Sequence, residues 1–178
     1  MLEKGVRKKY LPEFVYGATD GTITTFAIVA GVMGASLSSA VVLIMGFANL
    51  FADGFSMAVS NYLATKSGND TTSNQFKKNN KNYLKNPRKT APITFASFLV
   101  VGFIPLLPFV LAFFIPQIKE MQFQISMTLT ACAFLLIGTI KGRITKKPLV
   151  KSALQTLIIG SVAALLAFLV GYALQGIM

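Results

Sequence analysis

The chain has 178 residues, of which 53% are hydrophobic and only 13% charged, and its mean hydropathy is +0.61. A soluble domain carries about a quarter charged residues, so this composition excludes an ordinary globular protein and indicates a membrane protein. The absence of histidine and the single cysteine exclude a Cys/His zinc site, a disulfide framework, and Ser-His-Asp or Cys-His catalysis.

The first thirteen residues are basic and polar, and we interpret them as a retained N-terminal segment rather than a cleaved signal peptide. Five apolar stretches follow, at approximately 14–35, 40–64, 91–115, 123–140 and 149–174. A membrane-spanning helix needs about 20 mostly apolar residues, so we expect five such helices in one transmembrane domain over 1–178. Pro105 and Pro108 predict kinks in the third helix.

The 17 basic residues are divided very unequally among the connections. Sixteen lie before residue 14, in a short basic loop at 65–90, or between 141 and 151, and only Lys119 lies elsewhere. If five helices alternate, those three segments share one side of the membrane, which the positive-inside rule assigns to the cytoplasm. We therefore expect a cytoplasmic N-terminus and a C-terminus on the opposite side. Orientation accounts for the basic residues, so we expect anionic lipid rather than nucleic acid as their partner.

Two acidic residues, Asp20 and Asp53, lie within the predicted helices. A charge at the centre of a membrane costs about 3 kcal/mol, so such residues usually face a bundle interior or a water-filled path. Counted from the cytoplasmic helix ends at 1.5 Å per residue, Asp20 lies about 9 Å deep, Met57 about 10 Å and Asp53 about 16 Å. Asp20 and Met57 are therefore expected at a similar depth on neighbouring helices.

The spacing of polar residues predicts a shared ion path. Asn49, Asp53 and Met57 recur every fourth residue and so lie on one face of the second helix, and Asp20 shares a face of the first helix with Thr24. Oxygen ligands suit hard or borderline divalent cations, and a thioether adds preference for softer ones. Without histidine such a site would be weak, which suits transport because the ion must also leave.

A structural interpretation of the same residues remains open. Buried aspartates can be hydrogen-bonded packing elements, Thr and Asn often link helices, and a methionine on an apolar helix usually only packs. Spacing alone leaves Met57 and Asn49 undecided between the two roles. Gly17 and Gly21 form a small-xxx-small pair, which predicts close packing of another helix.

The segment YGATDGTITTFAIVAGVMGASLSSAVVLIMGFANLFADGFSMAVSNYLATKS, from Tyr16 to Ser67, resembles the vacuolar iron transporter family. The shared features are a first helix containing Asp-Gly, a short turn of small residues, and a second helix with Ser-Met and a YLATKS-type ending. The resemblance implies a five-helix homodimer whose ion path follows the dimer axis. It also implies export of Fe(II), and often Mn(II), from the cytosol in exchange for protons, with Asp20 and Met57 contacting the ion.

Two features depart from the family pattern. Plant and parasite members carry a Glu where this chain has Asn49, and a small residue where it has Asp53. Their Glu-rich cytoplasmic insert between helices two and three is replaced here by a short basic loop in which Asp70 is the only acid, and Gly68 stands where a Glu commonly occurs. We therefore expect no cytoplasmic capture of iron by glutamates, and we expect a different set of ligands to coordinate the ion within the membrane.

We expect a secondary transporter that exports Fe2+ and/or Mn2+ from the cytoplasm by proton antiport, with the ion as substrate and no cofactor. Asp20 would be the main ligand and a proton carrier, because desolvation disfavours the charged form of a carboxylate. Asp53 would be a second ligand or relay and Met57 a soft ligand, with Asn49 and Thr24 lining the path.

The alternatives are a transporter of another cation and a non-transporting membrane scaffold whose polar residues pack a dimer. No enzyme is expected, because the polar groups are few and no activated nucleophile is present. The expected location is the plasma membrane in a prokaryote, and a vacuolar or other organelle membrane in a eukaryote.

Overall fold

The computed structural model describes residues 2–75 and 84–177, with side chains for 9–71 and 84–177. The described helices are α1 (Leu2–Gly34), α2 (Ser39–Gln75), α3 (Pro87–Gly102), α4 (Leu107–Leu111), α5 (Gln122–Thr145) and α6 (Leu149–Leu174), with 3-10 turns η2 (Ile104–Leu106) and η3 (Pro116–Ile118). No strand occurs in these ranges. The predicted all-α fold is confirmed.

Four segments of the described chain are long and apolar enough to cross a membrane: Ser39–Thr71, Pro87–Leu111, Gln122–Thr145 and Leu149–Leu174. Helix α1 has 33 residues but is not among them. Asp20 and several threonines make its apolar half more polar than the other spans. An integral membrane protein is therefore supported by four segments, and the crossing of α1 stays a prediction.

Several helices extend beyond their predicted ends. Helix α1 begins at Leu2 rather than near residue 14, α2 continues to Gln75 rather than 64, and α5 continues to Thr145 rather than 140. An apolar run marks only the part of a helix that contacts lipid, whereas the backbone hydrogen bonds continue into polar sequence until a breaker intervenes.

The connection between α2 and α3 is consequently shorter than the predicted 65–90 loop. Helix α3 begins at Pro87, and the side chain of Asn86 caps it by accepting a hydrogen bond from the backbone N–H of Arg88 at 3.0 Å. Three lysines assigned to this loop, Lys77, Lys78 and Lys81, lie outside the described residues.

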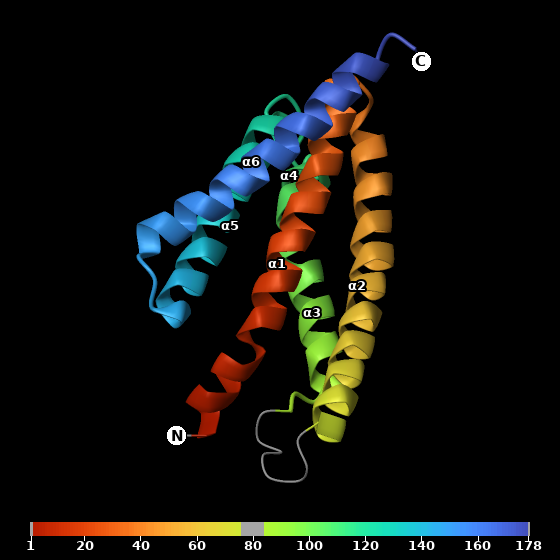
Figure 1. The fold of residues 1–178 in the computed structure, drawn as a ribbon. Helices are drawn as coiled ribbons and strands as arrows, with labels where there is room; N and C mark the ends of the chain where they lie inside the picture. The colour runs from red at the N-terminus through yellow and green to blue at the C-terminus, as the bar shows by residue number, and fades with distance from the viewer. Residues whose placement is uncertain (1, 76–83, 178) are drawn as a thin grey trace.

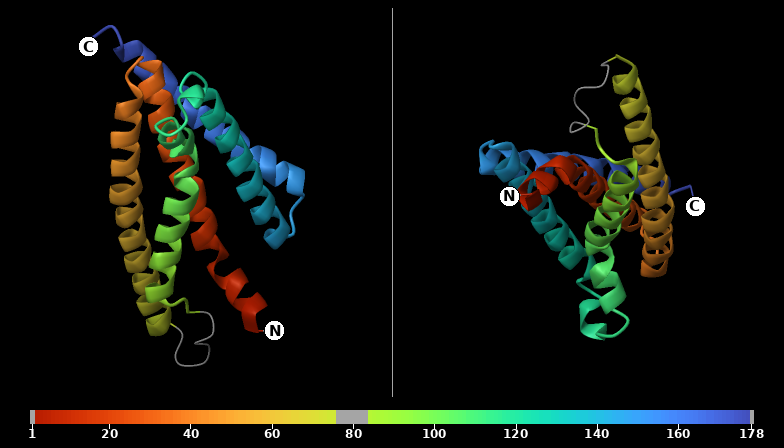
Figure 2. Two further views of the ribbon diagram at one scale, coloured as in Figure 1. Left: turned by 180° about the vertical axis from the view of Figure 1, so that it is seen from behind. Right: turned by 90° about the horizontal axis from the view of Figure 1, so that it is seen from below.

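Helix α1 occupies the centre of the bundle, between the α2–α3 pair and the α5–α6 pair (Figures 1 and 2). Small residues allow α6 to approach it closely. A Cβ added at Gly34 would collide with the backbone carbonyl of Phe168, and one added at Gly171 would collide with the carbonyl of Gly31. The backbones of α1 and α6 therefore touch near the C-terminal ends of both helices.

The third span is interrupted where the prolines predict a kink. Helix α3 ends at Gly102, and η2 and α4 follow at Pro105 and Pro108. The Ser126 hydroxyl of α5 donates to the carbonyl of Pro105 at 2.6 Å, which satisfies irregular backbone within the apolar region.

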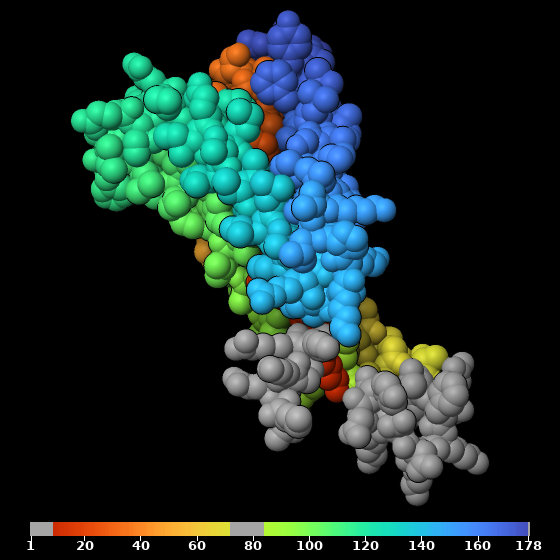
Figure 3. Space-filling model, turned by 90° about the vertical axis from the view of Figure 1, so that its left-hand side faces the viewer, coloured from red at the N-terminus to blue at the C-terminus, as the bar shows by residue number. Residues whose placement is uncertain are grey.

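The main apolar core lies between α1, α2, α3 and α4. It includes Phe26, Val29, Leu50, Phe98 and Phe109, each at most 7% exposed. By contrast, only 6% of the most apolar part of α6 is buried inside the protein. Figure 3 shows α6 lying on the outside of the molecule beside α5. The outer surface of α6 is therefore apolar and uncovered by the rest of the described chain.

The start of α1, the end of α2 and the start of α3 lie at one end of the molecule, and the end of α6 and the α1–α2 turn lie at the other (Figure 1). The α5–α6 turn lies in the same half as the start of α1. The described parts of the three basic segments are therefore displaced toward one end, as the predicted orientation requires.

Candidate functional site

The structure brings together the predicted polar residues of α1 and α2. The side-chain amide of Asn49 on α2 donates to the Thr24 hydroxyl on α1 at 3.2 Å. That hydroxyl in turn donates to the backbone carbonyl of Asp20 at 2.9 Å, one helical turn earlier. Because Asn49 uses its N–H group for this contact, its carbonyl oxygen is left to face another ligand.

The carboxylates of Asp20 and Asp53 lie near enough for their charges to interact. Both side chains are partly exposed at the surface of the single chain, although the helices around them are apolar. Across the described residues, no group of three or more His, Cys, Asp and Glu residues could hold a metal ion. The single chain therefore brings two carboxylates and neutral oxygen donors to one part of its surface, and oxygen ligands of this kind suit hard or borderline divalent cations.

Phe98 of α3 holds the two aspartate-bearing segments in place. It is fully buried, and a Cβ added at Gly21 would lie 2.6 Å from its carbonyl oxygen. A Cβ added at Gly54 would lie 3.0 Å from its ring. Each of these glycines directly follows a site aspartate, so both Asp-Gly pairs rest on the same residue. Sequence reasoning missed Phe98, because nothing in an apolar run distinguishes one phenylalanine from another.

The two predicted packing glycines face α3. A Cβ at Gly17 would collide with the Ser97 hydroxyl and the Thr94 carbonyl, and a Cβ at Gly102 would approach the Gly21 carbonyl to 2.8 Å. The small-xxx-small pair thus lies at the closest approach of α1 to α3.

Met57 lies in a different environment from the other site residues. It is 6% exposed and belongs to the apolar core that includes Phe98 and Leu50. Asn49 and Asp53, on the same side of α2, are partly exposed. A packing role explains the position of Met57 in the single chain, and its contact with an ion stays a prediction.

A second carboxylate on α1, which sequence reasoning missed, is the buried Glu13. It is 5% exposed, and its Oε1 accepts a 2.7 Å ion pair from the ammonium group of Lys85. Its Oε2 has no hydrogen-bond partner in the described part of the chain. Glu13 precedes Asp20 by seven residues, two turns along one face of α1, and this spacing was the signal that could have found it.

The chain is similar over most of its length to proteins named vacuolar iron transporter. It is 30% identical to one from Centaurea cyanus, over 88% of this chain and 84% of that protein. It is 26% identical to vacuolar iron transporter 1 of Eucalyptus grandis, over 92% and 86% of the two chains. A vacuolar iron transporter of Plasmodium berghei (strain Anka) is 27% identical, over 94% and 83%. These names are those of transporters rather than enzymes.

The alignment with the Eucalyptus protein extends over 217 residues, so that relative contains residues that this 178-residue chain lacks. A sequence model of the VIT family matches residues 11–90 and 75–172. These two matches overlap at residues 75–90, around the connection between α2 and α3. Together they cover almost the whole chain, including the helices that carry Asp20 and Asp53. The chain therefore belongs to the VIT family.

Proposed function

We propose that this protein carries a divalent transition metal ion, Fe2+ or Mn2+, out of the cytoplasm across a membrane in exchange for protons. The observation that carries the proposal is the pair of interacting carboxylates, Asp20 and Asp53, on adjoining apolar helices. Relatives named vacuolar iron transporter support metal ion transport as the activity.

The chain is proposed to work as a homodimer. Asp20 and Asp53 are partly exposed on the single chain, yet a charged side chain does not face lipid without a large cost. A second copy placed over this surface would cover them. It would also double the number of carboxylates at the site, which raises the affinity for a divalent cation.

Proton coupling follows from the chemistry of the ligands. A carboxylate must be deprotonated to bind a metal ion, so ion binding releases protons and ion release allows them to return. Asp20 is proposed as the main ligand and proton carrier, and Asp53 as a second ligand or relay. Asn49 and Thr24 line the path with neutral oxygens.

The cytoplasmic entrance differs from that of members with a Glu-rich insert. In this chain the described carboxylate nearest that end of α1, Glu13, is already paired with Lys85. We propose that ions reach Asp20 directly from the cytoplasm without prior capture by an acidic domain.

The test is ion flux into liposomes that contain the purified protein, with Fe2+ or Mn2+ outside and an imposed proton gradient. The Asp20→Asn variant should abolish flux, because it removes a carboxylate ligand while keeping the shape of the side chain. Asp70→Asn is the matched control, since Asp70 is an exposed acid on the same protein. Unchanged flux in Asp20→Asn would overturn the assignment.

Competition between metals in the same assay identifies the preferred ion and tests transport of another cation. A non-transporting scaffold makes a different prediction. Ion flux with the wild-type protein would then equal the background flux of empty liposomes, and Asp20→Asn would change only the stability of the dimer.

A further inference from the structure

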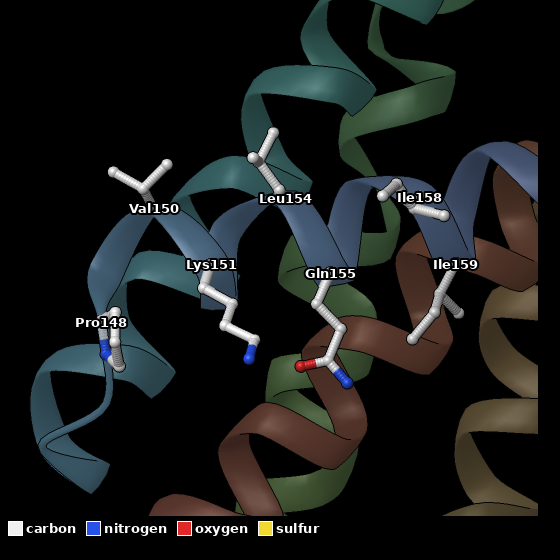
Figure 4. Close-up of a pocket in the computed structure, with 7 residues that line it drawn as sticks. All are labelled: Pro148, Val150, Lys151, Leu154, Gln155, Ile158 and Ile159. Carbon is white, nitrogen blue, oxygen red and sulfur yellow. The ribbon is translucent and has the colours of Figure 1, made fainter.

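The outer face of α6 carries a shallow groove of about 710 Å³ near the α5–α6 turn, called here the α6 groove. Its lining includes Lys151, Gln155, Ile158 and Ile159. Figure 4 shows the Lys151 and Gln155 side chains projecting from the same side of the helix. This groove is remote in sequence from Asp20 and Asp53 and plays no part in the proposed ion path.

One side of the α6 groove, formed by Lys151, Gln155 and Ile159, is ordered by polarity along the helix axis, and the apolar side chains of Val150, Leu154 and Ile158 lie beside it. Lys151 lies two residues after the first residue of α6, Gln155 lies one turn deeper, and two isoleucines follow. At 1.5 Å per residue, Gln155 is about 6 Å deeper than Lys151, and Ile159 is another 6 Å deeper. A phospholipid has the same order from the interface inward: a charged phosphate, ester carbonyls, and hydrocarbon.

The amide of Gln155 requires a partner in this position. It is exposed on a helix that is long and apolar enough to cross a membrane, and no side-chain hydrogen bond between described residues involves it. A primary amide without hydrogen bonds in an apolar medium is unfavourable. Lys151 can extend its ammonium group toward the interface, but the shorter Gln155 side chain lies at the depth of the ester groups.

The charge near the groove selects an anionic occupant. Residues 121–178 contain no Asp or Glu, and Arg143, Lys146 and Lys147 lie at the same turn as Lys151. A second copy of the chain does not fit this charge pattern, because a two-fold interface through this face would place Lys151 against its own counterpart.

We propose that the α6 groove binds one anionic phospholipid, with the phosphate on Lys151, an ester carbonyl on the Gln155 amide, and an acyl chain on Ile158 and Ile159. The proposal requires α6 to cross the membrane, but it does not depend on ion transport, so the two proposals can fail separately.

The test is native mass spectrometry of the full-length protein in detergent, titrated with phosphatidylglycerol and, separately, phosphatidylcholine. The wild type should retain phosphatidylglycerol more strongly. One interfacial lysine contributes about a fivefold preference for anionic lipid, so Lys151→Ala should weaken retention of phosphatidylglycerol roughly fivefold. Arg143→Ala is the matched control, because it removes an exposed positive charge at the same turn that does not line the groove.

A second comparison tests the ester contact. Ether-linked phosphatidylglycerol lacks the ester carbonyls, so the wild type should bind it more weakly than the ester-linked lipid. Gln155→Leu should remove that difference. Lys151 and Gln155 are both exposed, so Lys151→Ala and Gln155→Leu should fold, and their melting temperatures should match that of the wild type.

Two results would overturn the proposal. If Arg143→Ala weakens retention as much as Lys151→Ala, the basic turn attracts lipid without a defined site. If Ile158→Cys, placed in a Cys132→Ser background to remove the exposed native cysteine, forms disulfide-linked dimers in lipid vesicles, the groove is covered by a second copy.

Discussion

Gly21 and Gly54 show how the absence of a side chain shapes the candidate ion site. Each glycine follows an aspartate and lies against Phe98, so the α1 and α2 backbones approach α3 at the level of the carboxylates. The aspartates, offset by about 100° around their helices, are thereby turned away from α3 and toward the protein surface. The position of the carboxylates is therefore set by contacts that the carboxylates do not make themselves.

Replacing Gly21 with alanine should destabilise the protein by about 2 kcal/mol or more, because the new Cβ would lie 2.6 Å from the Phe98 carbonyl oxygen. Gly68→Ala is the control: a Cβ there has nothing within 4 Å, and alanine raises helix propensity by up to about 1 kcal/mol. Thermal denaturation in detergent measures both. Equal melting temperatures for the two variants would contradict the close approach of α1 to α3.

Thr24→Val should slow ion flux and cost about 1 kcal/mol of stability, because it removes the hydroxyl that accepts the Asn49 amide at 3.2 Å. Thr24→Ser keeps a hydroxyl and should restore flux. The measurement is the liposome assay at a fixed proton gradient. If valine and serine give the same flux, the hydroxyl does not position Asn49.

At the scale of elements, the end of the bundle near the start of α1 and the start of α3 is held by polar contacts. Lys85 pairs with Glu13 of α1, and its carbonyl accepts a 2.7 Å hydrogen bond from Asn69 of α2. The backbone N–H of Asn86 donates to the Tyr10 hydroxyl at 3.4 Å. The segment that leads into α3 is thus joined to both α1 and α2.

Removing Lys85 should be more harmful than removing both members of its ion pair. Lys85→Met leaves a carboxylate that is 5% exposed without its 2.7 Å partner, which we expect to cost about 3 kcal/mol. Adding Glu13→Gln to that variant should recover most of the loss, because the buried negative charge is then absent. Melting temperatures of the wild type, Lys85→Met, Glu13→Gln and the double variant together form a double-mutant cycle. A double variant no more stable than Lys85→Met would contradict a charge-based explanation.

At the scale of the whole molecule, α1 is central because its small residues face several neighbours at once. Gly17 and Gly21 face α3, while Gly31 and Gly34 face α6. This helix also carries Asp20. It is the one long described helix that does not qualify as a membrane span by length and hydropathy. A helix surrounded by protein tolerates polar residues that a lipid-facing helix does not.

If α1 crosses the membrane, the two termini must lie on opposite sides. Reporter fusions that are active on only one side should therefore give opposite results at the N-terminus and the C-terminus, with the N-terminal fusion cytoplasmic. The same result at both termini would mean that only the four qualifying segments span the membrane.

By itself the sequence determined the all-α class and the order of the long helices, and it singled out Asp20 and Asp53 as candidate site residues, because hydrophobicity and charge within apolar runs leave direct marks in composition and spacing. It could not place the helix ends, since α2 continues to Gln75 through polar sequence that has no apolar periodicity. Only the tertiary structure decided that Phe98 lies beneath both Asp-Gly pairs, that Met57 is in the core, and that Glu13 meets Lys85. These contacts join residues distant in the chain, and the packing that selects them leaves no local pattern to read.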